Sequence, residues 1–464
     1  MAKLKYGIIA SVVVAALAVA PLVVSQKIDA SLKDKATFLE QNGLKSETLS
    51  KSGYLTTQRT FSLEVTDGKK ARDFLLAQLV DKNTQYKLFA QALKEETEAG
   101  INEALNGLKF KGEMAYSNLL LSDVKVALTL SELPTAVQEN LLQDKEASAL
   151  ILPLLTRGVL GIDMLFGKDE ALKELKLKDI QEELKVEGGT VNVNTKDHTL
   201  KLNHRGESVY GSFGVAHQLI LADIEMMKSK SELKDFIYNF TYNNEFNNKA
   251  DLSIGNYALE IKDEYTNLNA GLGSLKANSS IEEQQKELQM KADYTFDKIF
   301  IGDSGDDIKL EKLLSTFFLR GLDTEVVRKL QADYNTLILN ETAPSEEVLL
   351  NDLIALINHG FKFDVDVMLQ GLTYDEISLK DIRVDTKLEI AKNSYTNKQS
   401  PLALLGLLEI NSKVKVHKDD RATLESLQLT SAEDFALGKA EGDYFVYEIA
   451  MKKGAISVNG QVIQ

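Results

Sequence analysis

Apolar and polar residues alternate along several segments of this chain, and this two-residue period constrains the fold more than any other feature of the sequence. Successive side chains of a β-strand point to opposite faces, so a segment with this period buries one face and exposes the other. The period is clearest over residues 361–367 and 408–416. We therefore predict an α+β fold in which antiparallel β-sheets predominate. The apolar positions of these two strands are Phe361, Phe363, Val365, Val367, Leu408, Ile410, Val414 and Val416.

Other segments repeat apolar residues at three- and four-residue spacing, which is typical of amphipathic helices. We expect these helices to cover the sheets. The polar segment 271–287 is predicted to be a connector between two parts of the body. Near the C-terminus, the pairs Lys453-Gly454 and Asn459-Gly460 are typical of tight hairpin turns, so a β-meander is expected there. The predicted helices are 71–104, 133–158, 307–334, 345–359 and 420–427.

Residues 6–26 carry no charged side chain. Their apolar part, 7–24, is about 18 residues long, or roughly 27 Å as a helix, which is close to the hydrocarbon thickness of a bilayer. We predict one N-terminal transmembrane helix, an uncleaved signal anchor, with a cleaved signal peptide as the alternative. Lys3 and Lys5 precede this segment and predict a cytoplasmic N-terminus with the body on the other side. The anchor residues are Ile8, Ile9, Val12, Val13, Val14, Leu17, Val19, Leu22, Val23 and Val24.

The charge of the chain argues against one large class of partners. Lys and Arg number 54 against 69 Asp and Glu, a net charge of −15, and no cluster of basic residues interrupts the acidic body. Such a surface repels phosphate backbones, so no nucleic-acid binding is expected. Without cysteine, the chain can form neither a disulfide framework nor a thiolate metal site. Stability must therefore come from burial, for which 44% hydrophobic residues are ample material.

Motifs of the common catalytic and cofactor sites do not occur in this sequence. The five histidines form no HExxH motif, and neither a phosphate-binding glycine loop nor a nucleophile elbow is present. The segment 302–307 resembles a calcium loop but lacks its ligand order and final glutamate, so a solvated turn is expected there. We therefore predict no enzymatic activity, no cofactor and no metal. A hydrolase that uses paired carboxylates is the alternative, although the chain lacks the tryptophan that often binds sugars.

Segments near the two ends of the chain resemble one family of bacterial envelope proteins. Residues 52–57, Ser-Gly-Tyr-Leu-Thr-Thr, lead into a predicted strand at 61–65, and residues 453–460 read Lys-Gly-Ala-Ile-Ser-Val-Asn-Gly. Together with the N-terminal segment, they are similar to the YdgA-like family, although the arginine-glycine pair expected after the tyrosine is missing. The resemblance implies an inner-membrane-anchored periplasmic protein of unassigned activity. It carries no catalytic residue over to this chain.

The chain is predicted to have a cytoplasmic tail at 1–5, the anchor at 6–26, a first β-rich portion with helices at 27–190 and a second at 191–464. The expected location is the bacterial inner membrane, with a single pass and the body in the periplasm. We expect a non-enzymatic protein that binds an apolar ligand, a lipid or an envelope protein on a β-sheet surface; a homodimer is a further candidate. Two alternatives stay open, namely a structural or assembly factor of the envelope, and a sheet sealed by its own helices.

Overall fold

The computed structural model describes most of the chain that follows the predicted anchor. The tail and the anchor, 1–26, lie outside the described residues. The residues that the structure describes are 36–53, 55–80, 104–117, 123–167, 171–205, 208–303, 306–340, 346–375, 377–396, 399–400, 402–427 and 436–463.

The described residues form two compact units. Unit 1 runs up to Arg205 and includes Gly211–Met227, whereas unit 2 comprises Gly206–Tyr210 and Lys228–Gln464. Each unit is built mainly of antiparallel strands, and the described chain is 64% strand and 20% helix. The β-rich character is therefore confirmed. The predicted α+β class is wrong, because strands outweigh helices too strongly and the fold is mostly β.

The predicted fold also included a transmembrane helix at 6–26. In the described part of the chain, no helix has the length and apolar composition that are needed to cross a membrane. The fold of the described residues therefore consists of sheets and short helices and does not include the predicted transmembrane helix.

Unit 1 is a set of antiparallel strands accompanied by helices. The ladders join its first six strands in chain order, and the sixth strand then pairs with the ninth. The strands are β1 (Leu44–Ser52), β2 (Thr56–Val65), β3 (Lys109–Ser117), β4 (Val124–Glu132), β5 (Gly161–Phe166), β6 (Leu172–Leu177), β7 (Ile180–Val186), β8 (Gly189–Lys196), β9 (Thr199–Arg205) and β10 (Ser208–Ile224). The helices are α3 (Gly68–Val80), α6 (Thr135–Gln143) and α7 (Lys145–Thr156).

The core of unit 1 lies between one face of β2–β5 and these helices. In β2 every second residue is buried, as the alternation of its sequence predicts. Phe74 of α3 and Leu141 of α6 belong to the same buried cluster as Phe61 and Leu128 of the sheet. Asp144 separates α6 from α7, and its carboxylate accepts a hydrogen bond from the Ala147 N–H, which caps α7.

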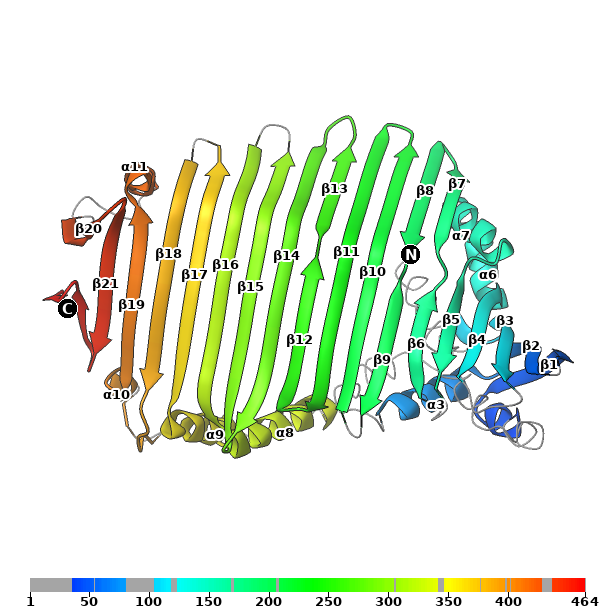
Figure 1. Cartoon of the computed structure of the whole chain (residues 1–464), viewed down its shortest axis with the longest axis horizontal. Coiled ribbons are helices and arrows are strands. Elements are labelled where there is room, and N and C mark those ends of the chain that lie inside the picture. Colours follow the sequence, from blue (N-terminus) through cyan, green and yellow to red (C-terminus); the bar gives the residue numbers. More distant parts are fainter. Residues whose placement is uncertain are drawn as a thin grey trace. The chain divides into compact units, whose positions relative to one another are not determined.

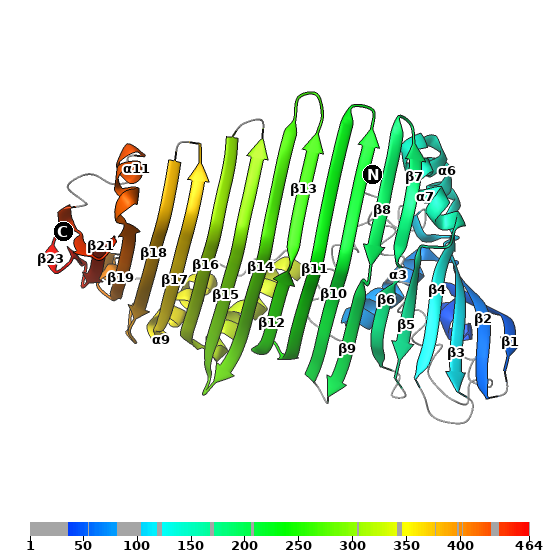
Figure 2. The same cartoon turned by 45° about the horizontal axis from the view of Figure 1, so that its top comes forward.

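Unit 2 is a long antiparallel meander (Figures 1 and 2). Its strands are β11 (Met227–Asn244), β12 (Asn247–Ile254), β13 (Asn256–Lys262), β14 (Asn267–Gln284), β15 (Glu287–Asp303), β16 (Asp306–Asp323), β17 (Phe361–Tyr374), β18 (Ile377–Ile390), β19 (Leu408–His417), β20 (Lys439–Glu441), β21 (Tyr444–Lys452), β22 (Ala455–Val458) and β23 (Gln461–Val462). Its helices are α8 (Thr324–Asn340), α9 (Glu346–His359), α10 (Leu402–Leu405), the short 3₁₀ helix η1 (Lys418–Asp420) and α11 (Arg421–Ser426).

The C-terminal meander agrees with the prediction. Lys453 and Gly454 have φ of 53° and 81° between β21 and β22, and Asn459 and Gly460 have φ of 49° and 84° between β22 and β23. Two consecutive residues with positive φ are the mark of the type I′ turn, whose twist suits a hairpin.

Two predictions on the central strands are wrong. The predicted helix at 307–334 begins as a strand, because β16 occupies Asp306–Asp323 and only the remainder belongs to α8. The predicted connector at 271–287 lies almost entirely in β14. In both segments, apolar residues depart from a two-residue period at one point, and this departure hid the strands.

Candidate functional site

One apolar surface crosses the long strands of unit 2. The ladders pair Leu272 with Ile299, Ile299 with Leu310, Leu310 with Leu372 and Leu372 with Leu379. Because ladder partners project from the same face of a sheet, these five side chains form a row across β14–β18.

A second apolar row lies three residues away along each strand. In an unbroken strand, a three-residue step would place the two rows on opposite faces. However, Leu372 and Leu379 of the first row pack in one cluster with Ile382 of the second, so the rows share a face. The second row is Leu275, Phe296, Leu313, Leu369 and Ile382.

An extra residue in each strand accounts for this step. Lys298 and Gly371 have φ of 55° and 66°, and the ladders skip these positions. The neighbouring strand skips one residue at the same place, so the register between the strands does not shift, and the alternation reverses beyond the skipped residues in every strand. We call this row of skipped residues the bulge. A Cβ on Gly371 would lie 2.5 Å from the Glu311 Cγ, and a Cβ on Gly273 would lie 3.0 Å from the Lys298 Cβ. Glycine on one strand therefore makes room for a long side chain on the next.

We call the whole surface on this side of β14–β19 the apolar face. At the ends of the strands the same ladders reach the charged residues Glu283 and Asp303, and none of the positions between them carries a charged side chain. They are Ala270, Leu272, Leu275, Ala277, Ser279, Ile281, Met290, Ala292, Tyr294, Phe296, Ile299, Ile301, Ile308, Leu310, Leu313, Ser315, Phe317, Leu319, Phe361, Phe363, Val365, Val367, Leu369, Leu372, Tyr374, Ile377, Leu379, Ile382, Val384, Thr386, Leu388, Ile390, Leu408, Ile410, Ser412, Val414 and Val416.

The middle of the apolar face is half-buried and not sealed. The Phe317 ring lies 6.2 Å from the Tyr294 ring and 6.4 Å from the Phe363 ring, centroid to centroid. These rings shield one another in part, yet all three side chains keep contact with solvent, as do Phe296 and Leu313 beside them. A closed core of this width would bury such residues almost completely.

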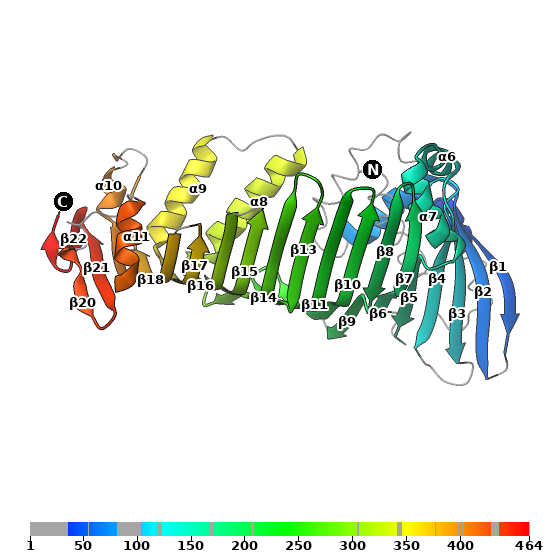
Figure 3. The same cartoon turned by 90° about the horizontal axis from the view of Figure 1, so that it is seen from above.

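Helices cover the apolar face at two of its ends. Val327 of α8 and Leu356 of α9 pack against the cluster that contains Leu319, near one end of the strands. Leu424 of α11 packs with Leu379 near the other end of β18. Figure 3 shows α8 and α9 on one side of the unit 2 sheet. The residues that lie between these two contacts, such as Phe296, Leu313 and Phe317, are the half-buried ones.

Hydrogen-bonding groups on the apolar face are few. The hydroxyls of Thr386 and Ser412 lie 2.8 Å apart and bond each other. Apart from these, the face carries the hydroxyls of Ser279 and Ser315 and of its tyrosines. A molecule lying on this surface would therefore meet mostly aliphatic and aromatic carbon.

The eight sequence-predicted sheet residues all lie on the apolar face. β18 connects the two predicted strands, since Phe363 pairs with Leu388 and Leu388 with Ile410. In the same way Val384 joins Val367 to Val414. Their role in binding stays a prediction. The predicted anchor residues and the two topology lysines lie outside the described residues.

A buried carboxylate occupies a position of β18 that faces away from the apolar face. The Asp381 Oδ2 atom accepts hydrogen bonds from the Arg383 Nη2 and from the Tyr444 hydroxyl, each at 2.7 Å. The Asp381 N–H donates to the buried carboxylate of Asp420 at 3.1 Å. Because these groups already have partners within the cluster, we assign it a structural role: it joins β18 to β21 and to η1.

The ionisation of this cluster follows from its contacts. Burial alone would raise the pKa of the Asp381 carboxyl, but its bonds to Arg383 and Tyr444 hold that pKa below the ordinary value. The hydrogen bond to the Asp381 carboxylate raises the pKa of the Tyr444 hydroxyl. The carboxylate form is thus the one that the folded protein stabilises.

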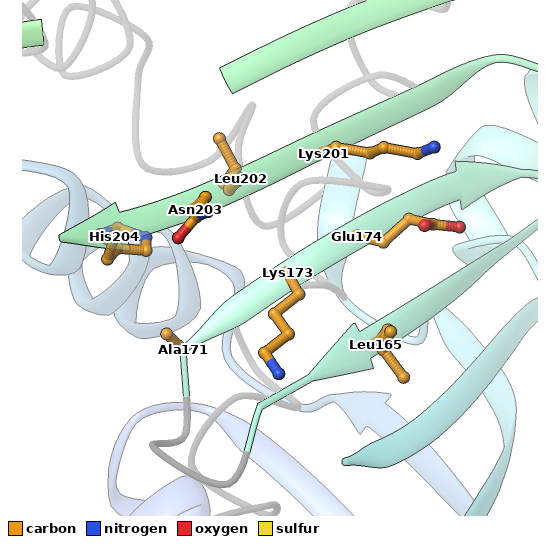
Figure 4. Close-up of a pocket in the computed structure, with 8 residues that line it drawn as sticks. All are labelled: Leu165, Ala171, Lys173, Glu174, Lys201, Leu202, Asn203 and His204. Carbon is orange, nitrogen blue, oxygen red and sulfur yellow. The ribbon is translucent and has the colours of Figure 1, made fainter. Parts of the chain in front are cut away.

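Unit 1 has a hollow between β5, β6 and β9, drawn in Figure 4. The Lys173 Nζ atom lies 2.9 Å from a carboxylate oxygen of Asp123, and Glu174 is the ladder partner of Lys201. In Figure 4 the polar side chains point in different directions, so they do not converge as the groups of a binding site would. The hollow is lined by Leu165, Ala171, Lys173, Glu174, Lys201, Leu202, Asn203 and His204.

Comparisons of this chain with known proteins give no relative. No family model, no curated protein and no solved structure matches it. Within the described ranges, no group of three or more His, Asp or Glu side chains could hold a metal ion. The resemblance to the YdgA-like family therefore stays a prediction, and functional inference depends on the apolar face itself.

The part of the apolar face that β14, β15 and β16 provide is not among the residues predicted from the sequence. The signal was present: alternation on each side of a three-residue step, from Leu272 to Leu275 in β14 and from Leu310 to Leu313 in β16. A search for two alternating stretches offset by one residue would have found these strands.

Proposed function

We propose that unit 2 binds the hydrocarbon part of an amphiphilic lipid on its apolar face, in a non-enzymatic role. The observation that carries this proposal is a wide uncharged sheet face whose central residues are half-buried. Removal of apolar surface from water is worth about 25 cal/mol per Å², so an acyl chain that covers roughly 200 Å² would gain about 5 kcal/mol. That gain exceeds what any isolated surface ion pair of this chain would give.

Hydrocarbon suits this surface better than a folded protein partner. Specific protein interfaces carry about one hydrogen bond per 100–200 Å², mixed with apolar contacts. The apolar face offers few donors and acceptors, and Thr386 and Ser412 already satisfy each other. An acyl chain needs no hydrogen-bond partner, so it loses nothing on such a surface.

A neutral fluorescent naphthyl probe tests the proposal on the full chain, and mass spectrometry of an organic extract identifies any lipid that co-purifies. Met290 lies on the apolar face and is 38% exposed, so Met290→Glu introduces a charge there without opening a core. We expect the affinity for the probe to fall by about tenfold or more, because the new carboxylate must lose water when the probe binds.

The neighbouring residue supplies the control. Gln289 points to the other face of β15, and Gln289→Glu adds the same charge. We expect it to leave probe affinity within about twofold of wild type. Equal losses in the two variants, or no binding by the wild-type chain, would reject the proposal. Recovery of a stable protein partner in place of lipid would favour the alternative, an assembly factor of the cell envelope.

The remaining expectations stay predictions from the sequence. These are the location at the bacterial inner membrane with a periplasmic body, the membrane as a partner, and a homodimer. The apolar face needs none of them to bind an amphiphile.

A further inference from the structure

The end of the apolar face that lies away from α8 and α9 is its most solvent-accessible border. Ile301 pairs with Ile308, and Ile308 with Tyr374, so the three side chains are neighbours across β15–β17. They are 45%, 37% and 42% exposed. In Figure 1, α8 and α9 lie at the opposite end of these strands. We call this trio the open border.

The turns next to the open border are acidic. The β13–β14 turn contains Asp263 and Glu264, Asp307 is the second residue of β16, and Asp375 follows Tyr374. The carboxylate of Asp263 accepts hydrogen bonds from the N–H groups of its own turn, which lowers its pKa and keeps it charged. A ligand that reaches the open border therefore meets negative charge.

Basic side chains near this end offset only part of that charge. Lys309 lies 2.9 Å from Asp307 and also packs over the Phe300 ring, and Lys380 is paired with Asp419. Lys262 precedes the first acidic turn. At the α8–α9 end, Lys286, Arg328 and Lys329 are paired with carboxylates, and further carboxylates lie beside them. Carboxylates therefore outnumber basic side chains at both ends, and the open border differs from the α8–α9 end by its exposed apolar side chains.

Aromatic rings add to the attraction for cations at this end. Tyr374 belongs to the open border, and Tyr265 in the β13–β14 turn is 86% exposed. The face of such a ring attracts an ammonium group within about 6 Å. Carboxylates and exposed rings next to an apolar surface suit an ammonium group attached to a hydrocarbon chain.

We infer that the apolar face selects amphiphiles with an amine or ammonium headgroup, which lies at the open border between the acidic turns while the chain lies along the strands. This inference rests on the proposed function and adds the chemical class of the ligand. The same turns disfavour anionic amphiphiles and anionic membrane surfaces by like-charge repulsion. They also disfavour a second copy that docks through the same border, since it would bring the same charges.

Competition between amphiphiles of equal chain length tests the inference on the full chain. Hexadecylamine and palmitate each displace the neutral naphthyl probe at low salt, and their relative affinities report the preference for the headgroup. We expect the amine to bind about tenfold more tightly or better, with a preference that shrinks as salt screens the carboxylates.

The variant Glu264→Gln with Asp307→Asn and Asp375→Asn removes three charges next to the open border. Asn tolerates the positive φ of 51° at Asp375, so the turn is retained. We expect the amine preference to fall about tenfold while the affinity for the neutral probe is unchanged. The control is Glu245→Gln with Glu287→Gln and Glu325→Gln, which removes three exposed charges near α8 and α9 and should leave the preference intact.

The outcomes separate the two proposals. Equal binding of amine and carboxylate by a chain that still binds the neutral probe overturns the headgroup inference and leaves the proposed function standing. A preference for palmitate, or equal effects of the two triple variants, also overturns it. Failure of the neutral probe to bind removes the proposed function and the inference together.

Discussion

The two units use the same alternation of apolar and polar residues but end in different states of burial. In unit 1, the inward residues of β2–β5 are buried to within a few per cent; Leu63 is 0% and Val126 1% exposed. In unit 2, their counterparts Phe296 and Leu313 remain half-buried. An alternating strand thus predicts which face is apolar, but not whether that face is covered.

Strand length explains the difference. The strands β2–β5 have 6–10 residues, whereas β14–β16 have 17 or 18. A strand of 17 residues spans roughly 56 Å, but α8, with 17 residues, spans only about 26 Å. Helices of this size can seal the short strands of unit 1. Over the long strands of unit 2 they reach only a part of the surface.

The largest expected effect comes from one substitution made in each unit. Met164 of β5 is 3% exposed, whereas Met290 of β15 is 38% exposed. Met164→Glu buries a carboxylate without a partner, and we expect it to cost more than about 4 kcal/mol or to unfold unit 1. We expect Met290→Glu to cost less than about 1 kcal/mol, because its carboxylate can reach water.

Urea denaturation followed by circular dichroism measures the two costs. Met164→Leu and Met290→Leu are the controls for lost methionine packing, and each should change stability by less than about 1.5 kcal/mol. If Met290→Glu proved as destabilising as Met164→Glu, the face in unit 2 would be sealed like that in unit 1, and the comparison would fail.

A smaller effect is expected for Asp381, which joins β18 to β21. Asp381→Ala leaves the Tyr444 hydroxyl and the Arg383 guanidinium without their shared partner, and we expect a loss of about 2 kcal/mol from unit 2. Asp385→Ala, at an exposed position on the same strand, should stay within about 0.5 kcal/mol of wild type. Urea unfolding at neutral pH distinguishes these outcomes.

A pH series sharpens the result for Asp381. The pKa of its carboxyl is lower in the folded state than in the unfolded state, where it is about 4. The contribution of this carboxyl to the free energy of unfolding is therefore complete above the unfolded pKa and is lost as the pH falls through the folded pKa. The Asp381→Ala variant should therefore lose less stability than wild type in this acidic range. Parallel curves for the two proteins would show that the carboxylate form is not the stabilising one.

The smallest effect is expected at the bulge that lets β17 keep one apolar face. Gly371 has φ of 66°, so Gly371→Ala should cost about 1 kcal/mol or more through backbone strain and through its contact with Glu311. Gly271→Ala is the control, since its nearest neighbour, the Tyr257 carbonyl oxygen, would lie 3.4 Å from the new Cβ. A thermal melt of each variant compares them. An equal change in the two would argue against a special role for the bulge.

Part of this fold could be predicted from the sequence. Which strands could be predicted depended on the spacing of apolar residues along each strand. From Phe361 to Val367 and from Leu408 to Val416 the two-residue period keeps one phase, with Ser412 the one polar residue at an apolar position, and this allowed the strands and their apolar residues to be predicted. In β16, by contrast, Leu310, Leu313 and Phe317 recur at three- and four-residue spacing across the bulge. That spacing is also typical of a helix, which explains the wrong prediction.

The candidate site was less predictable than the strands. Which residues share a face depends on the register between strands, and β18 joins the two predicted segments without showing this in its own sequence. How far helices cover a face depends on their length and placement, which alternation does not encode. Sequence alone therefore left open whether the sheet was sealed or accessible.

The bulge also limits how this sheet can change through evolution. Deletion of Gly371 alone would turn Leu372 and Tyr374 of β17 toward the solvated side, while their partners on β16 and β18 kept their orientation. Insertions or deletions within a single strand are therefore penalised. A lineage that widened such a sheet would do so most readily by duplicating a complete hairpin, with its bulged residues already in place.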